Sequence, residues 1–134
     1  MASPSFLASS LFVALGGAIG AWLRFLVGRI YVGWLGPIKA SAFPWGTLTA
    51  NVLGSLAMGL LAGWLARHGQ ASEGARLFLA VGLLGGFTTF SAFSLEFALM
   101  VERGTIGLAA LYVALSLIAG FAALFVGLAV MRAA

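Results

Sequence analysis

Residues 85–94 read GGFTTFSAFS, in the middle of an apolar stretch that runs from about Ala75 to Val101. Two glycines followed by two threonines weaken a helix, and unpaired backbone at membrane depth is tolerated only where it is buried in protein or lines a cavity. A helix broken here offers freed carbonyl groups to a cation and the N–H groups of its second half to an anion. The run therefore predicts a membrane-spanning helix that is broken at mid-membrane and offers an ion site.

The composition around this run is that of a membrane protein. Of the 134 residues, 63% are hydrophobic and 7% are charged, and the mean hydropathy is +1.14. An ordinary soluble domain is about one quarter charged. Since one crossing needs about 20 apolar residues, the chain has room for four or five crossings and for no soluble domain. We expect a single transmembrane domain over residues 1–134.

Apolar runs divide the chain into four spans. The expected spans are about 6–30, 45–65, 75–101 and 105–131. Between the first two, the stretch from Tyr31 to Phe43 contains Gly36 and Pro37, and we expect it to end one helix and permit reversal. Pro44 then suits a helix start, because it has no N–H to leave unpaired. The predicted fold class is an all-α membrane protein with four transmembrane helices, the third of them broken.

Small residues recur at four-residue spacing in the first two spans. Gly16 and Gly20 lie one helical turn apart in the first span, and Ser55, Gly59 and Gly63 follow the same spacing in the second. Such spacing lets helix backbones approach closely in lipid, where the hydrophobic effect does not hold helices together. We interpret these residues as packing contacts between helices.

Basic residues are balanced between the two ends of the predicted bundle. Four crossings place both termini on one side, with the loop between the second and third spans. The basic residues of the two sides are Arg67, Arg76 and Arg132 against Arg29, Lys39 and Arg103. Because orientation follows Lys and Arg asymmetry in short loops, this balance gives almost no preferred orientation. We expect a protein that can insert both ways.

Several functional classes are excluded by what the chain lacks. There is no Asp, and Glu73, Glu96 and Glu102 are too dispersed to form a pair of catalytic carboxylates. There is no Cys and a single histidine, His68, so a thiolate or histidine metal site cannot be completed. The basic residues form no stripe of the kind that binds nucleic acid. We therefore expect neither an enzyme nor a nucleic-acid binder.

Polar side chains at membrane depth are costly unless they are paired or face a wet cavity. Thr47, Asn51 and Ser55 lie at successive helical turns of the second span, and Tyr112 and Ser116 do so in the fourth. Interhelical hydrogen bonding and pore lining explain the Thr47 and Ser55 hydroxyls equally well. For Asn51 we favour function, because a hydroxyl can bond back to its own helix and a primary amide is harder to satisfy.

Two phenylalanines follow the predicted break. Phe90 and Phe93 share one helical face, with Ser91 between them. An aromatic pair at this spacing is usually part of a core, but these rings lie among hydroxyls and an amide. A ring edge carries positive charge density, so it can face a small anion without holding it too tightly for conduction. We interpret the pair as lining an anion route.

Three stretches resemble the Fluc (CrcB) family of fluoride channels. They are residues 17–25 (GAIGAWLRF), 45–55 (WGTLTANVLGS) and 85–96 (GGFTTFSAFSLE). The resemblance covers all four spans in order. It implies a fluoride-selective channel that exports fluoride passively across the bacterial cytoplasmic (inner) membrane and relieves fluoride toxicity. It also implies an antiparallel, dual-topology homodimer in membrane lipid, with two pores.

The resemblance further implies roles for individual residues. The expected pore residues are Asn51, Phe90, Phe93, Ser91, Tyr112, Ser116, Thr47, Arg24 and Glu96. Among these, Arg24 would lie in a vestibule and Glu96 near a pore end. A structural sodium ion at the dimer centre would be held by main-chain oxygens of Gly85 and Thr88. Ala92 stands where the family often has threonine, so that hydroxyl is missing from the expected pore.

Two other classes of protein share some of these features. A small multidrug transporter is also short and can insert both ways, but it needs a mid-membrane carboxylate on its first helix, and this first span has none. A structural subunit of a membrane complex would explain the glycines and the balanced charge. It would not explain Asn51 beside Phe90 and Phe93.

Overall fold

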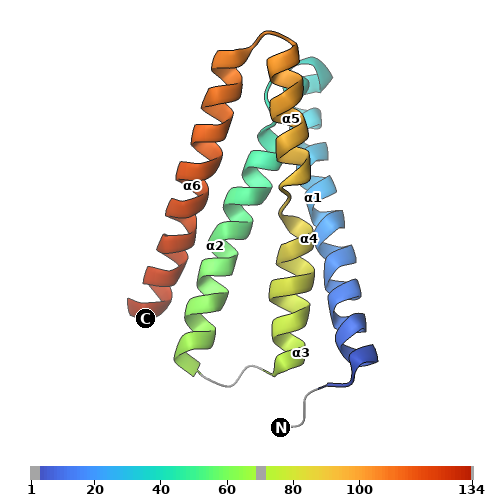
Figure 1. Ribbon diagram of the computed structural model, residues 1–134, viewed down its shortest axis with the longest axis vertical. Helices are drawn as coiled ribbons and strands as arrows, with labels where there is room; N and C mark the ends of the chain where they lie inside the picture. Colours follow the sequence, from blue (N-terminus) through green and yellow to red (C-terminus); the bar gives the residue numbers. More distant parts are fainter. Residues whose placement is uncertain (1–3, 69–71, 134) are drawn as a thin grey trace.

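A computed structural model describes residues 4–68 and 72–133, and within these ranges the protein is helical with no strand (Figure 1). The elements are α1 (Phe6–Ala42), α2 (Trp45–His68), α3 (Glu73–Arg76), η1 (Leu77–Leu84), α4 (Gly85–Phe87), α5 (Ser91–Glu102) and α6 (Ile106–Ala133). Four stretches are long and apolar enough to cross a membrane, and α3 to α5 together form the third of them. The predicted set of four spans is confirmed.

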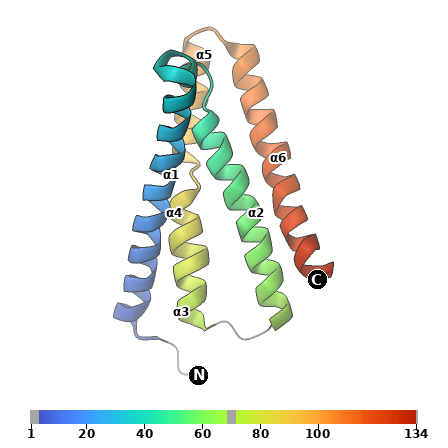
Figure 2. The same cartoon turned by 180° about the vertical axis from the view of Figure 1, so that it is seen from behind.

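The helices run up and down between two ends of an elongated bundle. The start of α1 and the end of α6 lie at one end, where α2 also ends and α3 begins (Figure 1). The junctions from α1 to α2 and from α5 to α6 lie at the opposite end in both views (Figure 2). The predicted loop between the second and third spans falls partly on residues 69–71, which lie outside the described residues.

The first span is longer than the sequence predicted. Helix α1 passes Ile30, and its 37 residues reach Ala42 as two helical segments that meet at a kink. The helix is interrupted at Gly36, whose φ of 76° and ψ of 162° are non-helical. Such a φ suits a residue without Cβ. The first helical segment therefore ends at Gly36, within the stretch predicted to end it, a short helical segment follows, and the chain reverses at Phe43–Pro44.

The first span packs backbone to backbone against the first half of the third. A Cβ on Gly16 or Gly20 would collide with main-chain atoms of η1, and a Cβ on Gly86 would collide with the backbone of Gly17. In the other half of the bundle, a Cβ on Gly59 would meet the carbonyl oxygen of Leu124 in α6. These close approaches confirm the predicted packing role of small residues.

The break in the third span lies slightly after the position suggested by the glycines. Gly85 and Gly86 are helical and belong to α4, whereas Thr88 is extended, with φ of −86° and ψ of 159°. Residues 88–90 then separate α4 from α5, at mid-height in Figure 1. The broken third helix is confirmed. Gly86 packs closely against α1, and the change of backbone direction begins at Thr88.

The upper end of the bundle contains the largest buried side chain. Tyr112 is fully buried and packs in a cluster with Phe43, Met100 and Ala109, against which Phe93 is half-buried. Helix α5 ends in a tight turn at Gly104, whose φ is 75°. This cluster fixes α5 against α6 above the break.

Candidate functional site

The side-chain amide of Asn51 on α2 forms hydrogen bonds with the backbone at the break. Asn51 Oδ1 accepts a hydrogen bond from the Thr89 N–H at 2.8 Å, and Asn51 Nδ2 donates to the Thr89 carbonyl at 3.1 Å. Thr89 Oγ1 accepts a hydrogen bond from the Ala92 N–H at 3.2 Å, which caps the start of α5 as a threonine commonly does. One primary amide thus satisfies both backbone groups of the residue at the centre of the break.

These hydrogen bonds take donors away from neighbouring carbonyl groups. In a continuous helix the Thr89 N–H would donate to Gly85, and the Ala92 N–H would donate to Thr88. Both donors are used elsewhere, by Asn51 and by Thr89 Oγ1. The Gly86 carbonyl is paired instead with a side chain, Arg24 Nε, at 3.2 Å. The carbonyls of Gly85 and Thr88 are therefore available to another ligand.

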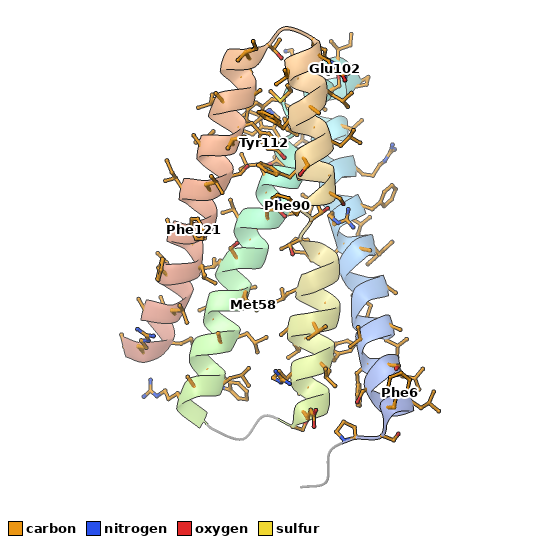
Figure 3. All side chains as sticks on the ribbon, viewed as in Figure 1. Phe6, Met58, Phe90, Glu102, Tyr112 and Phe121 are labelled. Carbon is orange, nitrogen blue, oxygen red and sulfur yellow. The ribbon has the colours of Figure 1, made fainter. Side chains whose placement is uncertain are left out.

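A cavity of about 450 Å³ lies beside the break. Polar groups of Asn51, Ser55, Thr88 and Thr89 line it together with Phe90. The Phe90 side chain is 79% exposed, and in Figure 3 it lies at the break, below Tyr112. Polar residues and an aromatic ring therefore meet at mid-height on the surface of the bundle.

A chain of aromatic rings leads from the break toward the upper end. The Phe90 and Phe93 ring centroids are 5.7 Å apart, and Phe93 is 5.1 Å from Tyr112. Phe43 continues the chain, 5.6 Å from Tyr112 in an edge-to-face arrangement. We call these four residues the aromatic chain. The two predicted phenylalanines are thus in contact with each other, and Phe93 also contacts the predicted tyrosine.

The carboxylate of Glu96 joins three helices above the break. Its Oε1 accepts a hydrogen bond from Thr47 Oγ1 and its Oε2 accepts one from Tyr112 OH, each at 2.7 Å. Hydrogen bonds to a carboxylate are short and stronger than neutral ones. We call this arrangement the Glu96 clamp. All three residues were predicted for the site, but their mutual pairing was not.

A second cavity, of about 460 Å³, opens on the α1 side of the Glu96 clamp. Arg24, Arg29, Thr47 and Glu96 line it, so two cations and one carboxylate face the same space. Arg24 was predicted at such a vestibule, and Arg29 was interpreted only as a topology signal. Tyr31 also lines the cavity, and the sequence reasoning did not select it.

The remaining predicted residues, Ser91 and Ser116, are part of neither the aromatic chain nor the Glu96 clamp. Ser91 Oγ is exposed and lies 3.3 Å from Thr89 Oγ1. Ser116 lines a separate cavity of about 220 Å³ with Ser55 and Gly120. Its hydroxyl is buried and has no hydrogen-bond partner among the described residues. A buried hydroxyl without a partner is uncommon, which sets Ser116 apart from the paired hydroxyls of Thr47 and Tyr112.

Comparison with known proteins gives a family and several close relatives. Residues 11–128 match the family model described as "CrcB-like protein, Camphor Resistance (CrcB)". A Novosphingobium aromaticivorans protein named "Fluoride-specific ion channel FluC" is 62% identical, covering 92% of this chain and 96% of that protein. Proteins of the same name from Erythrobacter litoralis and Rhodospirillum centenum are each 54% identical, covering 92% of this chain and 92% and 95% of theirs.

These matches bear directly on the alternatives left open by the sequence. The relatives are named as ion channels and not as enzymes, so the multidrug transporter and the structural subunit are not favoured. The match extends over nearly all of the four spans, and the predicted family is confirmed. This chain is a multi-pass membrane protein and belongs to the CrcB family.

Proposed function

We propose that this chain is a fluoride-selective channel that lets fluoride leave the cell passively across the bacterial cytoplasmic membrane and so relieves fluoride toxicity. The observation that carries the proposal is the aromatic chain, which connects the polar cavity at the helix break with the Glu96 clamp. The names of the relatives identify fluoride as the ion that those proteins conduct.

Fluoride is small and strongly hydrated, so its route must replace the hydrogen bonds of water. The Asn51 amide has two N–H donors, and one of them is used by the Thr89 carbonyl, which leaves the other for an anion. The electropositive ring edges of Phe90 and Phe93 would continue the route upward. Because no fixed cation lies in this aromatic segment, an ion held there can also be released.

Charged groups act at the ends of the route. Arg24 and Arg29 would draw anions into the larger cavity, since a cleft of one charge sign raises the local concentration of the opposite ion. Thr47 and Tyr112 hold Glu96 in place where that cavity ends. The buried Ser116 hydroxyl, in its separate cavity, would offer a donor to an ion that reached that cavity.

A second copy of the chain would complete the site. Phe90 is 79% exposed, and the cavity beside it contains backbone and side-chain polar groups at mid-membrane height. Such groups are expensive to expose to lipid, so we propose that a partner subunit covers them. The balance of basic residues between the two ends favours an antiparallel partner. The functional unit would then be a dual-topology homodimer with two pores.

We also propose a structural sodium ion on the dimer axis, held by carbonyl oxygens of Gly85 and Thr88 from both subunits. Both carbonyls have lost their helical donors, and Gly85 and Thr88 line the same cavity. No carboxylate lines this cavity, so the ion would join the subunits and not move with fluoride. The dimer should melt at a lower temperature in sodium-free potassium buffer, and an unchanged melting temperature would contradict this assignment.

The proposed function is tested by anion efflux from liposomes that contain the purified protein. With a potassium ionophore present to balance charge, fluoride should leave the liposomes rapidly and chloride should leave at the rate of empty liposomes. Equal efflux of both anions would contradict selectivity, and no efflux of fluoride would contradict the channel function.

The orientation of the subunits is tested separately in cells. A tag at the C-terminus should be accessible from both sides of the membrane, because the two orientations are equally populated in an antiparallel dimer. Adding lysines beside Arg132 should bias the orientation and reduce fluoride efflux. Tags accessible from one side only would contradict the antiparallel arrangement.

A further inference from the structure

A fourth cavity approaches the Glu96 clamp from the end of the bundle where α5 meets α6. It has a volume of about 160 Å³, and its lining includes Ser41, Glu96, Met100 and Arg103. Glu96 also lines the larger cavity that contains Arg24 and Arg29. The Glu96 carboxylate therefore lies where the two cavities meet, with basic residues on both sides of it.

Arg103 occupies a defined position at this fourth cavity. Its Nη1 donates a hydrogen bond to the Ser41 carbonyl at 3.2 Å, which places the guanidinium next to the C-terminal turn of α1. The side chain is exposed, so its remaining N–H donors face the outside of the bundle and the cavity. A cation at the mouth of a small cavity that leads to a carboxylate attracts anions and offsets the repulsion from that carboxylate.

The spacing along α5 supports this arrangement. Glu96, Met100 and Arg103 lie at intervals of four and three residues, so they share one face of the helix. This face turns toward the end of α1, because Arg103 is bonded to Ser41 and both Met100 and Arg103 line the cavity. The face thus leads from the exposed end of α5 inward to the Glu96 clamp.

We propose that Arg103 is the anion-attracting residue at the mouth of the route where α5 meets α6, and that fluoride passes through this fourth cavity between Arg103 and Glu96. This inference rests on the proposed fluoride conduction. Arg103 acts on the ion through its charge, and its bond to Ser41 holds that charge at the mouth. The competing explanation is that Arg103 only fastens α5 to α1.

Arg67 provides a matched control for the competing explanation. It is an exposed arginine whose Nη1 donates to a backbone carbonyl near a helix end, that of Met131, at the same distance of 3.2 Å. It fastens α2 to α6 but lines none of the four cavities described here. The two arginines therefore make similar structural contacts and differ in their relation to the route.

The test compares Arg103→Gln with Arg67→Gln in fluoride efflux from liposomes at low and high ionic strength. Glutamine can still donate to a carbonyl, so the helix contact is kept while the charge is lost. Arg103→Gln should slow efflux about fivefold at ~0.01 M salt of an impermeant anion and should match the wild type near 1 M, where charges are screened within about 3 Å. Arg67→Gln should match the wild type at both.

Other outcomes would overturn the inference. Wild-type efflux from Arg103→Gln at low salt would show that Arg103 only fastens helices. If Arg103→Gln does not fold, Arg103→Lys and the wild type are compared instead. Both keep the positive charge, so both should conduct fluoride faster at low salt than at high salt. Efflux that does not depend on salt would contradict the proposal. Absence of fluoride efflux from the wild type would contradict the proposed function itself, which keeps the two failures distinct.

Discussion

The lower half of the third span packs against α1 through main-chain atoms, whereas the upper half is held by side chains of other helices. Below the break, Gly82 and Gly86 approach the backbone of α1 so closely that neither position has room for a Cβ. Above the break, α5 is held by the hydrogen bonds of Glu96 with Thr47 and Tyr112, and by the aromatic chain.

The two halves of the third span therefore have different roles: the lower half supports the fold, and the upper half carries the functional groups. Main-chain contacts between glycines leave no side chain that can adjust, so the lower half fixes the height of the break. The upper half carries the polar and aromatic groups that an ion can meet. We therefore expect substitutions in the lower half to act on folding, and substitutions in the upper half to act on conduction.

The largest effect on folding should come from Gly20→Ala at the contact between α1 and the third span. The added Cβ would collide with the Leu83 carbonyl oxygen and the Phe87 amide nitrogen, and overpacking of this kind costs on the order of 3 kcal/mol. Most of the protein should be lost from the folded fraction in size-exclusion chromatography.

The control for this variant is Gly33→Ala on the same helix. A Cβ at Gly33 meets no atom within 4 Å, and alanine favours a helix over glycine by about 0.5–1 kcal/mol. Gly33→Ala should therefore melt at the wild-type temperature or above it. Equal melting temperatures for the two variants would contradict the close packing of the lower half.

A smaller effect is expected from Asn51→Ala at the boundary between the two halves. The change removes both hydrogen bonds to Thr89 and should destabilise the protein by about 1–3 kcal/mol, the cost of leaving the partly buried N–H and carbonyl of Thr89 unpaired. Thermal melting in detergent measures this loss. The control is Ser55→Ala, one turn along α2, whose hydroxyl has no hydrogen bond among the described residues and whose loss should change stability by less than about 0.5 kcal/mol.

The smallest effect on stability is expected from Glu96→Gln within the clamp. Glutamine keeps the shape of the side chain, and the hydroxyls of Thr47 and Tyr112 can reorient to accept from its amide. The variant should lose about 1 kcal/mol, since bonds to a neutral group are weaker than bonds to a carboxylate. Glu102→Gln, at an exposed position, serves as the control. A loss from Glu96→Gln as large as that from Asn51→Ala would show that the clamp holds the fold.

The sequence predicted the features that depend on short patterns. An apolar run of about 20 residues in lipid must form a helix, because its backbone groups have to be hydrogen-bonded within the segment. The four spans could therefore be predicted from hydropathy. Gly16, Gly20 and Gly59 were predicted as packing positions because small residues at four-residue spacing have one main use in lipid. The stretch that contains Gly36 was predicted to end a helix, but the short helical segment after it could not be predicted, since a glycine before a proline is equally compatible with a turn and with a bend in a helix.

Contacts between distant parts of the chain could not be predicted. The Asn51 amide was selected as a polar group at membrane depth, but spacing along one helix does not show that it binds the backbone of Thr89. The pairing of Glu96 with Thr47 and Tyr112 joins three helices, and only their packing reveals it. The position of Arg103 beside Ser41 depends on how far α1 extends.

The central claim is that the rings above the break conduct fluoride, and single substitutions in α5 test it most directly. Isoleucine keeps bulk and apolarity but removes the electropositive ring edge. Phe97→Ile is the control, because Phe97 lies on the same helix outside the aromatic chain. Fluoride efflux is measured per amount of folded protein in liposomes for Phe90→Ile, Phe93→Ile and this control.

We predict that both variants of the aromatic chain fold as dimers and lose efflux roughly tenfold or more, equivalent to about 1.4 kcal/mol of lost stabilisation along the route. The control should conduct at the wild-type rate. Wild-type efflux from well-folded Phe90→Ile and Phe93→Ile would contradict the account, because the two rings would then serve only as packing.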